Sequence, residues 1–131
     1  MTESDLRIIE AIQELIDANR AARDVMAAGE RVLERGIERL RAGESVSETL
    51  GYTPAGLQRQ ATQNANLRIA EARHELRLLL IGQCLEEGMR PFEIARAWGM
   101  SRQRVDRYIQ EIKRRPADTG RSTDPAGEAG E

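Results

Sequence analysis

The stretch LEEGMRPFEIARAWGMSRQRVDRYIQEIKRR, residues 85–115, carries the clearest structural pattern in this chain. Gly88 and Gly99 are suited to end helices, because glycine adopts a left-handed backbone conformation without steric penalty. Ser101 is a residue type that caps the start of a helix. The pattern therefore predicts one helix ending at Gly88, a second over 91–98, and a third beginning after Ser101.

The apolar residues of this stretch fall where two short helices that cross steeply would bury them. Ala95 lies four residues before Gly99, and its small side chain lets the two helices approach closely. At about 100° per residue, Ile109 and Ile112 fall on the inner side of the third helix. The expected inner face is completed by Ile94, Trp98, Met100, Val105 and Tyr108.

The pattern EEGMRPFEIARAWGMSRQRVDRYI resembles the trihelical helix-turn-helix of bacterial transcription regulators and of the DNA-binding ends of resolvases and sigma factors. The resemblance covers roughly residues 76–115. It implies that the last helix, over 101–114, lies in the major groove of double-stranded DNA. It also implies a sequence-specific transcriptional regulator of bacterial or phage type.

Opposite the apolar side, the third helix carries arginine and glutamine, which pair bidentately with guanine and adenine respectively. The residues expected to contact bases are Arg102, Gln103, Asp106 and Arg107. Those expected to contact phosphates are Ser101, Arg104, Lys113, Arg114 and Arg115. The alternative interpretation is a solvated Arg/Gln face or a protein-docking surface.

The charge of the chain is divided unevenly along its length, although its net value is only −2. Residues 90–115 hold 8 basic and 3 acidic side chains, a balance of +5, whereas residues 1–53 hold 7 and 11, a balance of −4. A positive segment in an otherwise acidic chain is typical of one defined docking face for phosphates.

The first forty residues predict a long amphipathic helix, because apolar residues from Ile8 to Leu40 alternate at spacings of four and three. One row of this heptad pattern is Ile12, Asn19, Met26, Leu33 and Leu40. The other row is Ile8, Leu15, Ala22, Gly29 and Gly36. Further apolar residues flank both rows, so the stripe favours packing against two or more helices, completed by a second subunit in a dimer.

Three residues of this pattern leave alternatives open. Asn19 is either a buried polar residue that fixes register or a solvated side chain. Gly29 and Gly36 each cost roughly 1 kcal/mol relative to alanine within a helix. They either allow a neighbouring helix to approach closely or mark breaks.

The region between the long helices contains local start and stop patterns. Gly43 suits the end of the first helix, and Ser45 with Glu48 forms a capping-box pattern for a short turn. Thr53 and Pro54 are the residue types expected at the cap and first position of a second long helix.

The expected fold is therefore all-α, with a long coiled-coil-like antiparallel helical pair leading into a C-terminal helix-turn-helix. Residues 1–75 form the oligomerisation or partner module, residues 76–115 the DNA-binding domain and residues 116–131 a disordered tail. The tail is expected to lack structure because it combines proline, glycine, alanine and acidic residues without apolar periodicity.

Other features argue against catalysis, cofactors, metals and membranes. The only histidine, His74, has no cysteine partner at metal-ligand spacing, so neither a metal site nor an enzyme is expected. The longest apolar run, 78–81, is far short of the ~20 residues of a membrane span. The single cysteine, Cys84, and a start without a secretion pattern favour the cytoplasm.

Two other functions also fit these observations. The chain could be a helical interaction module for a sigma-factor or anti-sigma-type partner, whose acidic surface would meet the arginines. It could also be a nucleoid or plasmid-partition protein that binds many DNA sites. Steep salt dependence together with sequence discrimination separates specific DNA binding from both.

Overall fold

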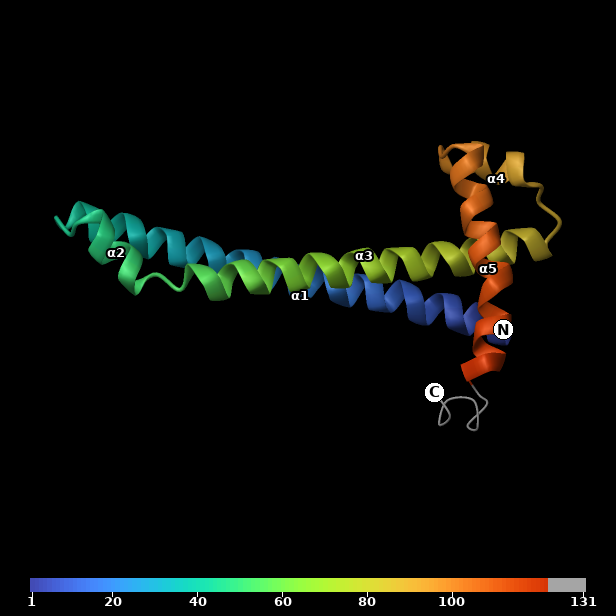
Figure 1. Cartoon of the computed structure of the whole chain (residues 1–131), viewed down its shortest axis with the longest axis horizontal. Helices are drawn as coiled ribbons and strands as arrows, with labels where there is room; N and C mark the ends of the chain where they lie inside the picture. The colour runs from blue at the N-terminus through green and yellow to red at the C-terminus, as the bar shows by residue number, and fades with distance from the viewer. Residues whose placement is uncertain (123–131) are drawn as a thin grey trace. The chain divides into compact units, whose positions relative to one another are not determined.

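The computed structural model describes the backbone of residues 1–122 and the side chains of residues 1–115. Within them the chain forms helices and no strand, so the all-α prediction is confirmed there. The helices are α1 (Glu3–Arg41), α2 (Val46–Tyr52), α3 (Ala55–Glu86), α4 (Pro91–Trp98) and α5 (Arg102–Ser122) (Figure 1).

The chain divides into two compact units. Unit 2 comprises residues 9–74, and unit 1 comprises residues 1–8 together with 75–131. Both long helices, α1 and α3, contribute to each unit. The two units are described separately below.

In unit 2, α1 and α3 are joined by two polar contacts. The Gln58 side chain donates from Nε2 to the backbone oxygen of Val25 at 3.0 Å. Farther along, Arg68 donates from Nε and Nη2 to the Glu14 carboxylate at 2.9 and 3.0 Å. Contacts that lie later along α1 therefore fall earlier along α3. The buried apolar side chains of α1 and α3 in unit 2 are small, which lets the helices approach closely: Ala18, Ala22 and Ala72.

At Gly29 a side chain of α3 lies close to the backbone of α1. A Cβ atom at Gly29 would lie 2.8 Å from Nε2 of Gln58, closer than non-bonded atoms tolerate. At Gly36 the nearest atom, Cγ2 of Thr49, would lie at an ordinary 3.9 Å. Helix α1 continues through both glycines to Arg41, so close approach is confirmed at Gly29 and neither glycine breaks the helix.

The loop and short helix after α1 follow the expected local rules. Gly43 has φ of +94°, as a helix-ending glycine requires. Ser45 Oγ accepts from the Glu48 N–H at 3.1 Å, while the Glu48 carboxylate accepts from the Ser45 N–H at 3.1 Å, which confirms the capping box. The bond from the Ser45 N–H, and then a second one of 2.9 Å from the Ser45 hydroxyl to the same carboxylate, lower the pKa of Glu48 because they favour its charged form.

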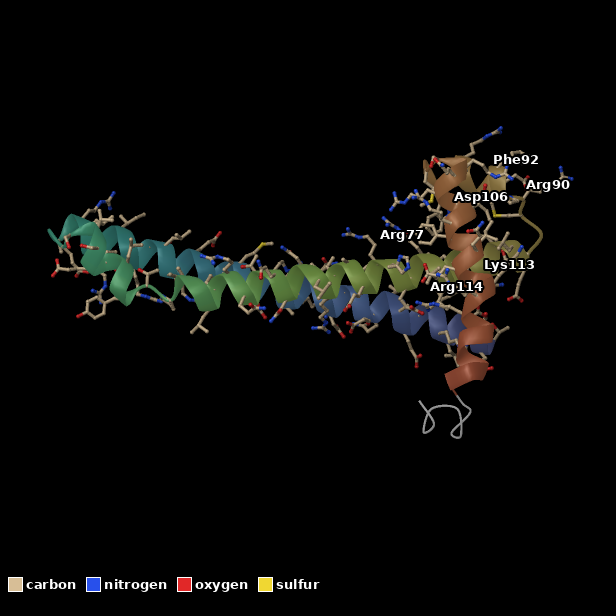
Figure 2. All side chains as sticks on the ribbon, viewed as in Figure 1. Arg77, Arg90, Phe92, Asp106, Lys113 and Arg114 are labelled. Atoms are coloured by element: carbon tan, nitrogen blue, oxygen red, sulfur yellow. The ribbon has the colours of Figure 1, made fainter. Side chains whose placement is uncertain are left out.

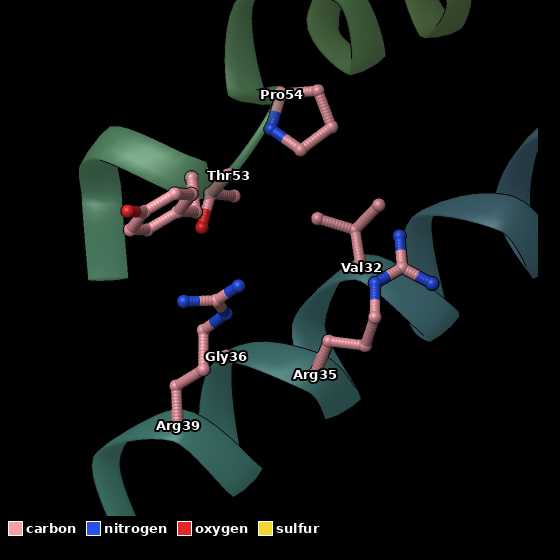
Figure 3. A pocket seen from close by; sticks show the side chains of 7 residues that line it. Val32, Arg35, Gly36, Arg39, Thr53 and Pro54 are labelled. Carbon is pink, nitrogen blue, oxygen red and sulfur yellow. The ribbon is translucent and has the colours of Figure 1, made fainter. Parts of the chain in front are cut away.

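Helix α2 is held to α1 through Arg39. The Arg39 guanidinium makes two hydrogen bonds of 3.0 Å to the Glu44 carboxylate and lies 4.3 Å from the centre of the Tyr52 ring. A hollow of about 60 Å³ remains beside this contact, bounded by Val32 and Pro54 (Figure 3). The hollow is too small for more than a water or two, so it is a packing imperfection rather than a ligand site.

Thr53 was expected to cap the start of the second long helix, but it caps the end of α2 instead. Thr53 ends α2: its N–H bonds to the Leu50 oxygen at 3.2 Å, and its hydroxyl donates to the Thr49 oxygen at 2.7 Å. With its hydroxyl engaged in this way, Thr53 does not cap α3, which begins at Ala55.

The two heptad rows of α1 differ in environment. The row containing Ala22 and Gly29 is buried or half-buried. The row containing Asn19 and Leu33 is exposed throughout, so the solvated alternative holds for Asn19 within one chain. We call the following exposed residues the outer strip: Ile9, Ile12, Ile16, Asn19, Arg23, Met26, Glu30, Leu33, Ile37 and Leu40.

In unit 1, the end of α3 packs with α4 and α5 around one apolar core. Its buried members are Leu78, Ile81, Ile94, Val105 and Tyr108. Half-buried side chains surround them, among them Trp98, Met100, Ile109 and Ile112. The core side predicted from sequence for the second and third helices of this region is therefore confirmed.

Helix α5 extends beyond the predicted boundary at Arg114. Its backbone remains helical to Ser122, so the segment 116–122 is not the irregular chain expected from its composition. The rest of the predicted tail, 123–131, lies outside the described residues.

Candidate nucleic-acid interface

The turn between α4 and α5 sets the direction of α5. Gly99 adopts φ of 63° and ψ of 32°, the left-handed conformation in which glycine carries no Cβ penalty. The following N–H, of Met100, bonds to the Ala95 oxygen at 3.1 Å and closes the end of α4. Ser101 Oγ then accepts from the Arg104 N–H at 3.1 Å and caps α5. The predicted roles of Gly99 and Ser101 are confirmed.

The start of α4 is fixed by a carboxylate. Glu93 Oε1 accepts from the Arg90 N–H at 2.7 Å, and Pro91 occupies the first turn as predicted. Gly88, with φ of +94°, separates this start from the end of α3. Both ends of α4 are therefore determined by local backbone chemistry.

Burial of one side of α5 fixes the direction of the other. Val105 and Tyr108 lie in the core, and the Tyr108 hydroxyl lies 3.4 Å from Nη1 of Arg77, which donates to it. The Arg104 guanidinium lies 6.0 Å from the centre of the Tyr108 ring, at the edge of cation–π range. Because α5 is anchored along this side, its opposite side is presented to solvent.

The four residues expected to contact bases lie together on the first two turns of α5. Gln103 and Arg107 are exposed and one helical turn apart. The other two, Arg102 and Asp106, form an exposed ion pair in which Arg102 Nε donates to Asp106 Oδ1 at 3.2 Å. Figure 2 shows Asp106 on α5 in unit 1.

The residues expected to contact phosphates divide into two groups. Among the side chains that the structure describes, Lys113 and Arg114 are exposed and make no ion pair within 4 Å (Figure 2). Arg115 instead binds Glu75 at 2.8 Å and Glu111 at 3.5 Å. The carboxylates facing Arg115 make it a weaker candidate for a phosphate than its neighbours.

Two exposed arginines of α4 and its cap received no individual role from the sequence. Arg90 precedes α4 and Arg96 lies on its last turn, and both belong to the same positive segment as α5. Their contribution to the +5 balance of residues 90–115 was the only pattern that could have identified them.

Other chemistry is sparse in the described part of the chain. No three His, Cys, Asp or Glu side chains gather there in a way that could hold a metal ion. Burial, and then the charge of Glu87, raise the pKa of the half-buried Cys84 thiol, which disfavours the reactive thiolate. None of the described helices combines the length and apolar character needed to cross a bilayer.

A comparison of the chain with protein-family models, curated proteins and solved structures finds no match.

Proposed function

We propose that this protein is a sequence-specific DNA-binding transcriptional regulator of the bacterial or phage cytoplasm, acting as a dimer. In this proposal α4, the Gly99 turn and α5 form a helix-turn-helix, and α5 enters the major groove. The observation that carries the proposal is the two-sidedness of α5. Its inner side is held in the core of unit 1, while its outer side presents exposed glutamine and arginine near a capped N-terminus.

Base recognition is assigned to the first turns of α5. Gln103 and Arg107 are the two side chains best suited to adenine and guanine, because both are exposed and neither makes an ion pair among the described side chains. Gln103 can donate one hydrogen bond to adenine and accept one from it, whereas Arg107 can donate two to guanine. The Arg102–Asp106 pair has a positioning role, since each restrains the other beside them. A good bidentate contact discriminates against a wrong base by roughly 1–3 kcal/mol.

Phosphate binding is assigned to Arg104, Lys113 and Arg114. Each phosphate neutralised on duplex DNA contributes about 0.9 to the slope of log affinity against log salt. Three such contacts per chain therefore give a slope of about −3, and about −5 for two chains. The acidic remainder of the chain opposes broad coating of DNA, which favours one face.

The test is selection of fragmented genomic DNA on the purified protein, followed by titration of the recovered sequence at several salt concentrations. The variant Gln103→Ala/Arg107→Ala removes the proposed base contacts. A matched control, Arg31→Ala/Gln60→Ala, removes the same residue types at exposed positions of unit 2. We expect the wild type and the control to recover one motif and the first variant to lose it.

The remaining outcomes separate the alternative functions. Equal recovery of unrelated sequences by all three proteins would point to an architectural or partition-type binder. No DNA recovery at low salt would remove the proposal and favour a protein partner for the arginine face. If the Arg31→Ala/Gln60→Ala control lost the motif, the base contacts would lie on unit 2 and the assignment to α5 would be wrong.

A further inference from the structure

Among the residues that the structure describes, the outer strip of α1 stays exposed, and most of its side chains are apolar. It follows a heptad spacing over residues 9–40, and its seven apolar side chains are 38–69% exposed. Single exposed apolar residues are ordinary, but seven on one face of one helix, gathered mainly at the two ends of the strip, are of the kind found at interfaces. The neighbouring row of α1, which contains Ala22 and Gly29, is buried or half-buried in unit 2. A partner that covers the outer strip therefore has to come from another molecule.

We propose that the outer strip pairs with the outer strip of a second copy of this chain, with the two α1 helices antiparallel. The proposal concerns unit 2 and does not depend on DNA binding. In an antiparallel helix pair, one heptad position meets the other position of its partner in successive layers. The strip can therefore be tested for self-complementarity layer by layer.

One register matches the strip to itself along its full length. Its outer layers are wholly apolar: Ile9 faces Leu40, Ile12 faces Ile37 and Ile16 faces Leu33 of the second copy. Its central layers contain every polar residue of the strip: Asn19 faces Glu30, and Arg23 faces Met26. The apolar ends of the strip and the polar pair Asn19 and Glu30 thus lie symmetrically about its midpoint, and only the Arg23–Met26 layer combines a polar with an apolar residue.

Charge complementarity strengthens this register. Asn19 can donate its amide hydrogens to the facing Glu30 carboxylate. The Arg23 guanidinium lies one layer, about 5 Å, along the helix axis from the same carboxylate. The pairing therefore places one positive and one negative side chain of each copy beside their opposites at the centre.

Other pairings of the strip are disfavoured by the same residues. A shift by one heptad in either direction places Glu30 against Ile12 or Arg23 against Leu33. A parallel in-register pair places Arg23 against Arg23 and Glu30 against Glu30. Like charges in facing positions select against the wrong partner orientation.

Light scattering and sedimentation equilibrium test the pairing first. We expect a dimer at tens of micromolar protein. Leu33→Asp, at an exposed position, should weaken dimerisation by at least about 100-fold, because two copies of one apolar layer are lost. Leu57→Asp, on an exposed part of α3 outside the strip, is the matched control and should remain a dimer.

Disulfide crosslinking then tests the orientation, in a Cys84→Ala background. The double variant Ile16→Cys/Leu33→Cys should form a covalent dimer on mild oxidation, whereas Leu33→Cys alone should not. In a parallel pair Leu33→Cys alone would form the covalent dimer, because position 33 would then face position 33 of the second copy. Circular dichroism of each variant checks that the helices remain formed.

Charge exchange provides the third test. Arg23→Glu and Glu30→Arg should each weaken the dimer, and the double variant should restore it, because opposite charges meet again. A monomer at 100 µM, self-crosslinking by Leu33→Cys alone, or two charge variants without mutual rescue would each overturn the proposal. DNA binding measured on Leu33→Asp keeps a failure here separate from a failure of the proposed function.

Discussion

Replacing Gly29 with alanine sets two effects of similar size against each other. Alanine is favoured over glycine within a helix by about 1 kcal/mol. The new Cβ atom, however, would lie 2.8 Å from Nε2 of Gln58 and displace the end of that side chain. The displacement breaks the 3.0 Å hydrogen bond from Gln58 to the Val25 oxygen, a net loss of about 0.5–1.5 kcal/mol. We therefore expect Gly29→Ala alone to change the free energy of unfolding by less than about 0.5 kcal/mol.

The gain should appear once Gln58 is shortened. In a Gln58→Ala background the space beside position 29 is open, so Gly29→Ala should stabilise unit 2 by about 1 kcal/mol. The difference between backgrounds is the coupling energy of a double-mutant cycle, expected at about 0.5–1.5 kcal/mol. Urea unfolding at one fixed protein concentration measures all four proteins, since dimerisation makes stability concentration-dependent. A coupling near zero would refute the close contact, and a loss above about 2 kcal/mol for Gly29→Ala would show that the helices cannot adjust.

Three further substitutions test unit 1. Ile94→Ala, at a fully buried core position, should destabilise the protein by about 2–5 kcal/mol in urea unfolding, whereas Leu57→Ala, largely exposed on α3, should cost less than about 1 kcal/mol. Glu75→Gln should leave the free energy of unfolding nearly unchanged because its ion pair with Arg115 is exposed, but should steepen the salt slope of the proposed DNA binding by about 1 as Arg115 is released. Burial raises the folded-state pKa of the Cys84 thiol. Its contribution to stability is therefore present below the ordinary thiol pKa and is lost as pH rises through the folded-state pKa. The free energy of unfolding should decline between pH 7.5 and 9.5, and this thiol-dependent decline should be missing in Cys84→Ala.

Local backbone chemistry was predictable from the sequence. Gly43, Gly88 and Gly99 were expected to end helices, and all three have positive φ. Ser45 and Ser101 were expected to cap helices, and both accept the expected backbone N–H. These features depend on interactions within four residues, which the sequence displays directly. Thr53 was misplaced because a Thr-Pro pair suits both the end of one helix and the start of the next.

The packing between helices was harder to predict from the sequence. The heptad pattern showed two apolar rows on α1 but not which row meets α3. The structure buries the row with Ala22 and Gly29, because small residues allow the backbones to come close, and leaves the bulky row with Leu33 exposed. The difference in side-chain size between the two rows was visible in the sequence and could have indicated which row packs against α3.

The candidate site shows the same division. Exposure of Gln103 and Arg107 followed from the position of the apolar residues one turn away. The engagement of Arg115 by Glu75 did not, because the two residues are forty positions apart and meet only when α5 packs on α3. Residue-type arguments could assign Arg115 to a positive face but not reveal its carboxylate partner.

The order of contacts between α1 and α3 determines where each chain leaves the proposed pairing of unit 2. Because Glu14 contacts Arg68, residue 9 and residue 74 mark the same end of unit 2. Antiparallel pairing of the outer strips sends the corresponding ends of two copies in opposite directions, and residues 9–40 span about 47 Å as a helix. The two chains then leave the paired units farther apart than the ~34 Å of one DNA turn.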